Sequence, residues 1–180
     1  MAEVFLRRLT RWQAETQRES VADLYAAAHR DPVSGQAPGR EDFLRRFAEH
    51  DVQRPGFEMV IGSDPALAGC CYGYPLDSAD DRHRELTGEL PDALREQGTA
   101  GGLFLVAELL VLPVHRRTRV ATRLQETLLM RSSAARAVVL LGSDNAPARA
   151  AFRSWGWDPV ERPGQPAEAV GREVWSRALR

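Results

Sequence analysis

The sequence LLVLPVHRRTRVATRL, residues 109–124, joins an apolar stretch to an amphipathic one through a short basic loop. Leu103–Leu112 is almost continuously apolar and has the length of a strand, which is typical of a strand buried in the centre of a sheet. Val120–Met130 repeats apolar residues at helical spacing. The segment therefore predicts a buried strand, a loop after Pro113 and a helix that begins near Val120.

A helix that starts directly after a loop presents unpaired main-chain N–H groups and the positive end of its dipole. Such a terminus attracts anions, phosphate and pyrophosphate among them. Arg116, Arg117 and Arg119 add full positive charges beside it. We therefore predict an anion site here, with a solvated basic surface as the alternative.

A second informative block, DNAPARAAFRSWGW, spans residues 144–157. Asp144 or Asn145 can cap a helix that runs to Ser154. The apolar segment Ala137–Leu141, which precedes the block, predicts another buried strand.

The two blocks resemble motifs A and B of the GNAT family of N-acetyltransferases, V-x-P-x-x-[Q/R]-x-x-G-x-[G/A] and N-x-x-A-x-x-x-Y-x-x-x-G-F. The positions that match are Val111, Pro113, Arg116 and Ala121 in the first, and Asn145, Ala148 and Gly156 in the second. The resemblance implies one α/β domain over residues 1–180. It would have a mixed sheet of six to seven mostly antiparallel strands, splayed at the centre and flanked by about four helices.

The resemblance also implies acetyl-CoA as cosubstrate. The pantetheine arm would pair with the main chain of Leu109, Leu110 and Val111. The pyrophosphate would lie on the loop and first helical turn, namely Arg116, Arg117, Thr118, Arg119, Val120, Ala121 and Thr122. Asn145, Arg149 and Phe152 would border the coenzyme.

Two positions depart from the family pattern. Arg119 stands where the family usually has glycine, which lets the main chain approach a phosphate closely. Its side chain would either crowd the site or add a charge-assisted bond to phosphate. Phe152 stands where the family commonly has a tyrosine that protonates the departing thiolate, and phenylalanine has no proton to donate.

Glu108 interrupts the apolar strand just before the basic loop. A buried carboxylate is costly unless it is paired or functional. We consider two roles: a general base that accepts the proton of an amine acceptor, as an acid on this strand does in the family, or a structural partner of an arginine. The acidic segment Asp77–Glu96 would favour a cationic amine if it lined the acceptor site, and would otherwise be a solvated loop.

The amino-acid composition argues against several other classes of protein. All 24 basic residues are arginine against 25 acidic ones, and a net charge of −1 gives no broad footprint for nucleic acid. Cys70 and Cys71 are strand neighbours, which point to opposite faces and do not favour a disulfide. We expect no metal site, no membrane segment and a cytoplasmic location, since no zinc spacing, long apolar run or signal peptide is evident.

The N-terminal half carries periodic patterns but no motif. We expect a strand at Val4–Leu9, helices within Glu15–His29 and over Arg40–Asp51, and a hairpin of Phe57–Gly62 with Ala66–Tyr74. A short helix within Leu90–Glu96 and a last strand at Glu173–Leu179 complete the pattern.

Three functions remain open on the sequence. The first is acetyl transfer from acetyl-CoA to a primary amine by direct attack in a ternary complex. The second is a catalytically impaired domain of the same fold that binds acyl-CoA as a sensor. The third is a nucleotide-binding protein, although the glycine-rich dinucleotide and P-loop patterns are missing. Family members often form homodimers, so the resemblance also suggests a homodimer.

Overall fold

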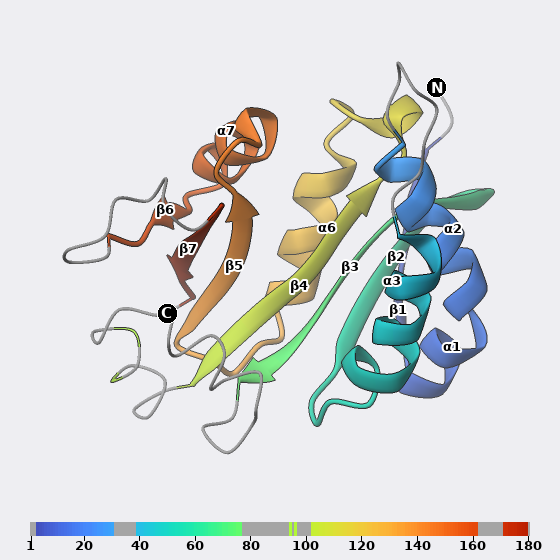
Figure 1. Ribbon diagram of the computed structural model, residues 1–180, viewed down its shortest axis with the longest axis horizontal. Coiled ribbons are helices and arrows are strands. Elements are labelled where there is room, and N and C mark those ends of the chain that lie inside the picture. The colour runs from blue at the N-terminus through green and yellow to red at the C-terminus, as the bar shows by residue number, and fades with distance from the viewer. Residues whose placement is uncertain are drawn as a thin grey trace. The chain divides into compact units, whose positions relative to one another are not determined.

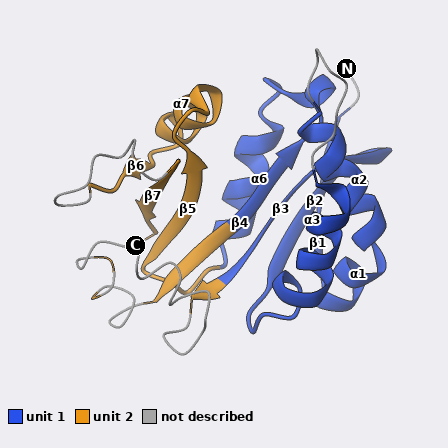
Figure 2. Ribbon diagram, in the orientation of Figure 1, with its two compact units in different colours: residues 1–74, 107–131 blue, residues 75–106, 132–180 orange. Residues whose placement is uncertain are grey.

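The computed structural model describes residues 3–30, 39–76, 94, 96, 102–161 and 171–179. The chain divides into two compact units (Figure 2). The first comprises Met1–Tyr74 and Ala107–Arg131, and the second comprises Pro75–Val106 and Ser132–Arg180. The basic loop and the helix after it thus lie within the first unit. A single domain over residues 1–180 stays a prediction.

The strands form a seven-stranded sheet in the order β1-β2-β3-β4-β5-β7-β6. β4 and β5 are parallel over Leu103–Leu105 and Arg136–Val138, whereas β1 with β2, β2 with β3, β5 with β7 and β6 with β7 are antiparallel. The predicted mixed, mostly antiparallel sheet is therefore confirmed. The strands are β1 Phe5–Leu9, β2 Glu58–Asp64, β3 Ala66–Leu76, β4 Leu103–Val111, β5 Arg136–Gly142, β6 Asp158–Pro159 and β7 Arg172–Ala178 (Figure 1).

In the first unit, the N-terminal helical region is longer than its apolar periodicity predicts. Helix α1, Arg11–Thr16, begins at a capping box in which Thr10 and Gln13 satisfy each other's main-chain N–H groups. Helix α2, Arg18–Ala28, follows after Gln17 and buries its apolar face. The apolar pattern reveals only α2, because α1 buries a single residue, Ala14.

The predicted helix Arg40–Asp51 changes its hydrogen bonding part-way along. Helix α3 spans Arg40–Arg46, and a π-helical turn, η1, spans Phe47–Asp51. The N–H of Val52 donates to the carbonyl of Phe47 five residues earlier, at 3.0 Å. Such turns are rare and often occur at functional sites. This one brings Asp51 into the protein interior with 1% of its surface exposed.

The main core of the first unit lies between one face of its strands and the helices α1, α2 and α3 (Figure 1). Strand alternation places Cys70, Tyr72 and Leu110 on this face, and all three are buried. Glu108 is two residues before Leu110 and shares that face. The other face receives Leu124 of helix α6, Val120–Leu129, and this side chain would lie 3.1 Å from a Cβ added at Gly69.

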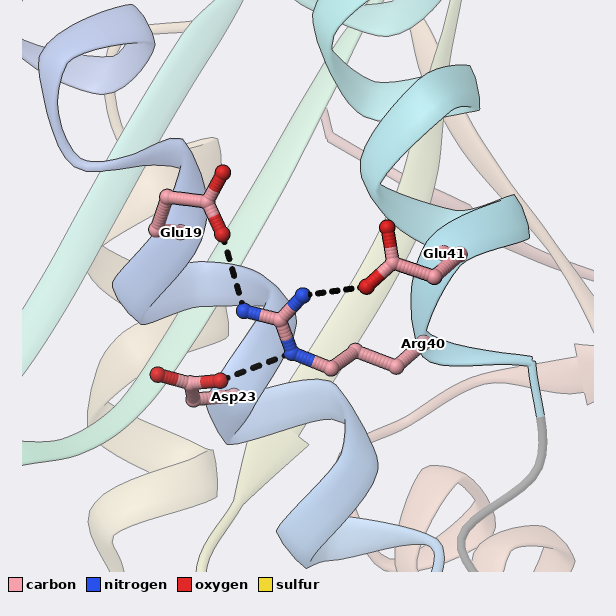
Figure 3. A network of polar contacts seen from close by, with 4 residues as sticks. All are labelled: Glu19, Asp23, Arg40 and Glu41. Atoms are coloured by element: carbon pink, nitrogen blue, oxygen red, sulfur yellow. Dashed lines mark hydrogen bonds and ion pairs between the residues drawn. The ribbon is translucent and has the colours of Figure 1, made fainter.

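Helices α2 and α3 are joined at the surface by a network around Arg40 (Figure 3). The guanidinium donates to Asp23 at 2.8 Å and to Glu19 at 2.9 Å on α2, and to Glu41 at 2.6 Å on its own helix. The three carboxylates are 62% to 80% exposed. Arg40 thus ties the start of α3 to α2 without entering the core.

The predicted strand–loop–helix segment is confirmed. Strand β4 ends at Val111, a 3-10 turn, η2, spans Pro113–His115, and helix α6 spans Val120–Leu129. The N–H of Leu112 donates to the carbonyl of Ala68 at 2.9 Å, which holds the end of β4 beside β3.

The second unit contains β5, helix α7, which spans Ala146–Ser154, and strands β6 and β7. Trp157 and Trp175 are fully buried there. The predicted strand and helix at 137–154 and the last strand are confirmed, while the two-residue strand β6 was not predicted. Most of the expected helix within Leu90–Glu96 and of the acidic segment Asp77–Glu96 lies outside the described residues.

Candidate functional site

The loop between β4 and α6 carries a run of unpaired main-chain donors. The N–H of Arg116 donates to Pro113, and the next main-chain donor to find a carbonyl is that of Arg123, which donates to Arg119 at 3.0 Å. Within the described part of the chain, the N–H groups of residues 117–122 donate no hydrogen bond of normal geometry. A helix start alone leaves four such donors, so the loop adds two to them.

The loop backbone bends in a way that few side chains tolerate. Arg117 and Arg119 have φ values of 61° and 65°, and among described residues other than glycine only these two have positive φ. Each such residue costs about 1–2 kcal/mol relative to glycine. Arg119 therefore adopts the backbone conformation that a glycine would supply. Left-handed residues next to helical ones turn successive N–H groups toward one point, where an anion fits.

The three arginines of the loop have different surroundings. Arg116 donates to the carbonyl of Val111 at 3.3 Å and to that of Ala28, at the end of α2, at 2.6 Å. It therefore fixes the loop against the rest of the unit. Arg117 and Arg119 are exposed, and their side chains form no ion pair or hydrogen bond with other described residues. Thr118 bonds the carbonyl of His115 through its hydroxyl.

The main chain that precedes the loop lies in close contact with β3. Leu110 and Val111 are buried and Leu109 is half-buried. A Cβ at Gly69 would lie 2.7 Å from the carbonyl oxygen of Leu110, so only glycine fits there without a shift of the main chain. This close packing fixes the position of residues 109–111 relative to the loop.

Glu108 is held by an arginine from α3. Nη2 of Arg46 donates to Oε1 of Glu108 at 2.7 Å, and the Glu108 side chain is 20% exposed. The ion pair with an arginine, which was the structural alternative to a catalytic role for Glu108, is therefore present. The same guanidinium lies 3.5 Å, Nε to Oδ2, from Asp51, whose side chain is 2% exposed. Tyr72 donates its hydroxyl hydrogen to Oδ2 of Asp51 at 2.8 Å.

The charges of this cluster affect nearby titratable groups. Burial, the charge of Glu108 and that of Asp51 raise the pKa of Tyr72 well above its usual value, so its hydroxyl stays protonated. Burial also raises the pKa of the Cys70 and Cys71 thiols, and Glu108 adds to both effects. Because a thiolate is the nucleophilic form of cysteine, these two buried thiols are unsuited to a covalent acyl intermediate.

The remaining sequence-predicted residues belong to the second unit. Asn145 caps α7, accepting from the N–H of Ala148 at 3.2 Å. Arg149 pairs with Glu173 of β7 at 3.1 Å. Phe152 is 5% exposed and meets the rings of Trp155 and Trp157 edge-on, with centroids 5.1 and 5.2 Å away. Each side chain thus has a structural task within its own unit.

Sequence reasoning missed Arg46 and Asp51. Nothing in a sequence pairs residues 46 and 108, which are 62 positions apart. A weak signal existed at Tyr72, because a tyrosine within a buried strand needs a partner for its hydroxyl. Among described residues no group of three or more His, Cys, Asp or Glu lies close enough to hold a metal ion. None of the described helices is long and apolar enough to cross a bilayer.

Solved structures of similar fold cover nearly the whole chain. A GNAT-family acetyltransferase from Staphylococcus aureus Mu50 matches with a TM-score of 0.66 and 11% identity, over 99% of this chain and all of that one. This chain has the GNAT fold. Another match is the PaiA N-acetyltransferase of Thermoplasma acidophilum in complex with coenzyme A, with a TM-score of 0.64 and 8% identity over 98% of this chain and 99% of that one.

An acetyltransferase from Thermus thermophilus has the same fold, with a TM-score of 0.64 and 13% identity over 97% of this chain and 96% of that one. No protein-family model matches the sequence, and neither does any curated protein. At these identities the likeness establishes the fold, and the chemistry has to be argued from the chain's own residues.

Proposed function

We propose that this protein is an N-acetyltransferase that moves an acetyl group from acetyl-CoA to a primary amine by direct attack in a ternary complex. The observation that carries the proposal is the run of unpaired N–H groups at residues 117–122. A diphosphate with its two negative charges suits a run of unpaired N–H donors, two exposed arginines and a helix dipole. In this proposal the main chain of Leu109–Val111 would receive the pantetheine arm.

In the proposed reaction the amine nitrogen attacks the thioester carbonyl carbon, and the C–S bond then breaks. The amine must lose a proton, which Glu108 accepts directly or through a water molecule. The coenzyme departs as a thiolate. A thiol with a pKa near 8.5 is a fair leaving group, so water can supply its proton where Phe152 cannot. Asp51 and Glu108 each carry a negative charge, and negative charge at this place would favour a cationic amine.

The binding half of the proposal is tested at Ala121, the second residue of α6. Replacing it with proline removes one of the six donors and should leave the helix intact, because α7 already carries Pro147 at the same position. A lost bond to a charged group is worth about 1.5–3 kcal/mol, so CoA affinity by calorimetry should fall roughly 10- to 100-fold. Ala121→Gly retains the donor and is the matched control.

Equal CoA affinities for Ala121→Pro and Ala121→Gly would contradict the proposed site.

The catalytic half is tested by the release of free thiol from acetyl-CoA with a panel of primary amines. Tight CoA binding without thiol release for any amine would contradict the transferase.

A second function is favoured by two observations: Phe152 packs against the rings of Trp155 and Trp157, and Glu108 is bonded to Arg46. Under this alternative the chain binds acyl-CoA as a sensor without turning it over. It predicts CoA binding that Glu108→Gln leaves unchanged, together with the absence of thiol release.

A further inference from the structure

The polar side chains beneath the helices of the first unit form one connected cluster. Tyr72 bonds Asp51, Asp51 lies against Arg46, and Arg46 bonds Glu108. The members come from β3, η1, α3 and β4, so four separate elements converge on it. We call this set of four residues the Arg46 cluster.

Arg46 lies closer to the carboxylate of Glu108 than to that of Asp51. Its bond to Glu108 measures 2.7 Å, while its nearest approach to Asp51 measures 3.5 Å. Oδ1 of Asp51 is buried and accepts no hydrogen bond from the described part of the chain. A buried carboxylate without a nearby cation costs several kcal/mol. Asp51 therefore depends on the same guanidinium that Glu108 binds, and the two carboxylates compete for it.

We propose that Arg46 and Asp51 together set the proton affinity of Glu108, with Arg46 holding it ionised and Asp51 offsetting part of that effect. This inference rests on the proposed function, in which Glu108 accepts the proton of the amine. A carboxylate bonded to an arginine alone would be a weak base. The charge of Asp51 restores part of its basicity. Arg46 is thus a positioning residue, and Asp51 acts through it.

Several other titratable groups of the described residues lie near Glu108. Burial raises the pKa of Tyr25, and the charge of Glu108 raises it further while Arg46 lowers it. Burial lowers the pKa of Arg46, but Tyr72, Glu108 and Asp51 raise it more, so the guanidinium stays charged. Within the described part of the chain, Glu108 affects the pKa of Tyr25 on α2, of Arg46 on α3, and of Cys70, Cys71 and Tyr72 on β3. At neutral pH only Arg46 among them is ionised.

The test follows the carboxyl carbons of labelled Asp and Glu by NMR during a pH titration, with Glu108→Gln to assign the signal. Removing the cation in Arg46→Met should move the midpoint of Glu108 to higher pH by about 1–3 units. Removing the competing charge in Asp51→Asn should move it to lower pH. Arg46→Lys keeps the charge and should return the midpoint toward that of the wild type, and Arg40→Met is the control for loss of an arginine on α3.

Opposite shifts in the first two variants support the inference, because a merely structural cluster has no reason to give them. The inference would be overturned if the Glu108 midpoints of Arg46→Met and Asp51→Asn equalled that of the Arg40→Met control. It would also be overturned if both midpoints moved in the same direction. If Arg46→Met does not fold, the direction of the shift in Asp51→Asn decides. The titration needs no turnover, so it separates this inference from the proposed activity. In an active enzyme the acid limb of the kcat/KM profile should move with the NMR midpoint.

Discussion

Arg40 and Arg46 lie at the two ends of helix α3, and each faces more than one carboxylate. Arg40 binds three carboxylates that are at least 62% exposed, whereas Arg46 binds two that are 20% and 2% exposed. Water and salt screen charges at the surface, and they do so far less in the interior. Burial of its partners, more than the number of ion pairs, therefore determines how strongly an arginine stabilises the fold.

The largest effect is expected in catalysis. Glu108→Gln removes the proposed proton acceptor, and loss of a general base typically lowers kcat about 10²- to 10⁴-fold. Glu41→Gln removes a carboxylate from Arg40 in the same way and should leave kcat unchanged. Thiol release at saturating acetyl-CoA measures both. Equal rates for the two variants would assign Glu108 a purely structural role.

The next effect is on stability. Arg46→Met leaves Asp51 buried without its cation, and breaking such a pair costs about 3–5 kcal/mol. Because the Arg46 side chain is 35% exposed, we expect the low end, about 3 kcal/mol, in urea unfolding. Arg40→Met is the matched control and should unfold at nearly the wild-type urea concentration. Similar losses in both variants would refute the importance of burial.

A smaller loss is expected from Tyr72→Phe, which deletes only the hydroxyl bonded to Asp51. The cost should be about 1–3 kcal/mol, because a buried charged acceptor loses a donor. Tyr25→Phe is the control, since no hydrogen bond of the Tyr25 hydroxyl is present among described residues. Urea unfolding at pH 7 measures the difference, and equal midpoints would mean that Asp51 does not need this donor.

The same variant makes a prediction about alkaline pH. The pKa of Tyr72 is raised in the folded protein above its ordinary value of 10.0. The stability that this provides is complete below pH 10 and falls as pH rises above it, because the unfolded tyrosine then loses its proton. The slope for one group is about 1.4 kcal/mol per pH unit. Tyr72→Phe should therefore lose less stability than the wild type above pH 10, and parallel declines would contradict the shift.

The smallest effect concerns salt. Any difference in Tm between the wild type and Arg40→Gln should disappear in 1 M NaCl, where the screening length is only about 3 Å. The difference between the wild type and Arg46→Gln should persist, because Asp51 is inaccessible to solvent. If the Tm difference caused by Arg46→Gln also disappeared in 1 M NaCl, salt would screen the ion pairs of both arginines and burial would not distinguish them.

The features that depend on neighbouring residues could be predicted from the sequence. The apolar run before Pro113 and the helical spacing after Val120 predicted strand, loop and helix, and all are present. The capping residue Asn145 was one of two candidates because a helix start needs a side-chain acceptor close by. These signals are local, and a local pattern is complete in the sequence.

The arrangement of the candidate site depends on contacts between elements that are distant in the chain. The tertiary structure gave Arg119 a glycine-like backbone, because its loop is fixed at both ends by β4 and α6. It also gave Glu108 its partner from a helix 62 residues earlier in the chain. The carboxylate that interrupts β4 can be seen in the sequence. Whether this carboxylate bonds to water or to a guanidinium depends on which elements pack on that face of the sheet. Such packing brings together residues that no local sequence pattern connects.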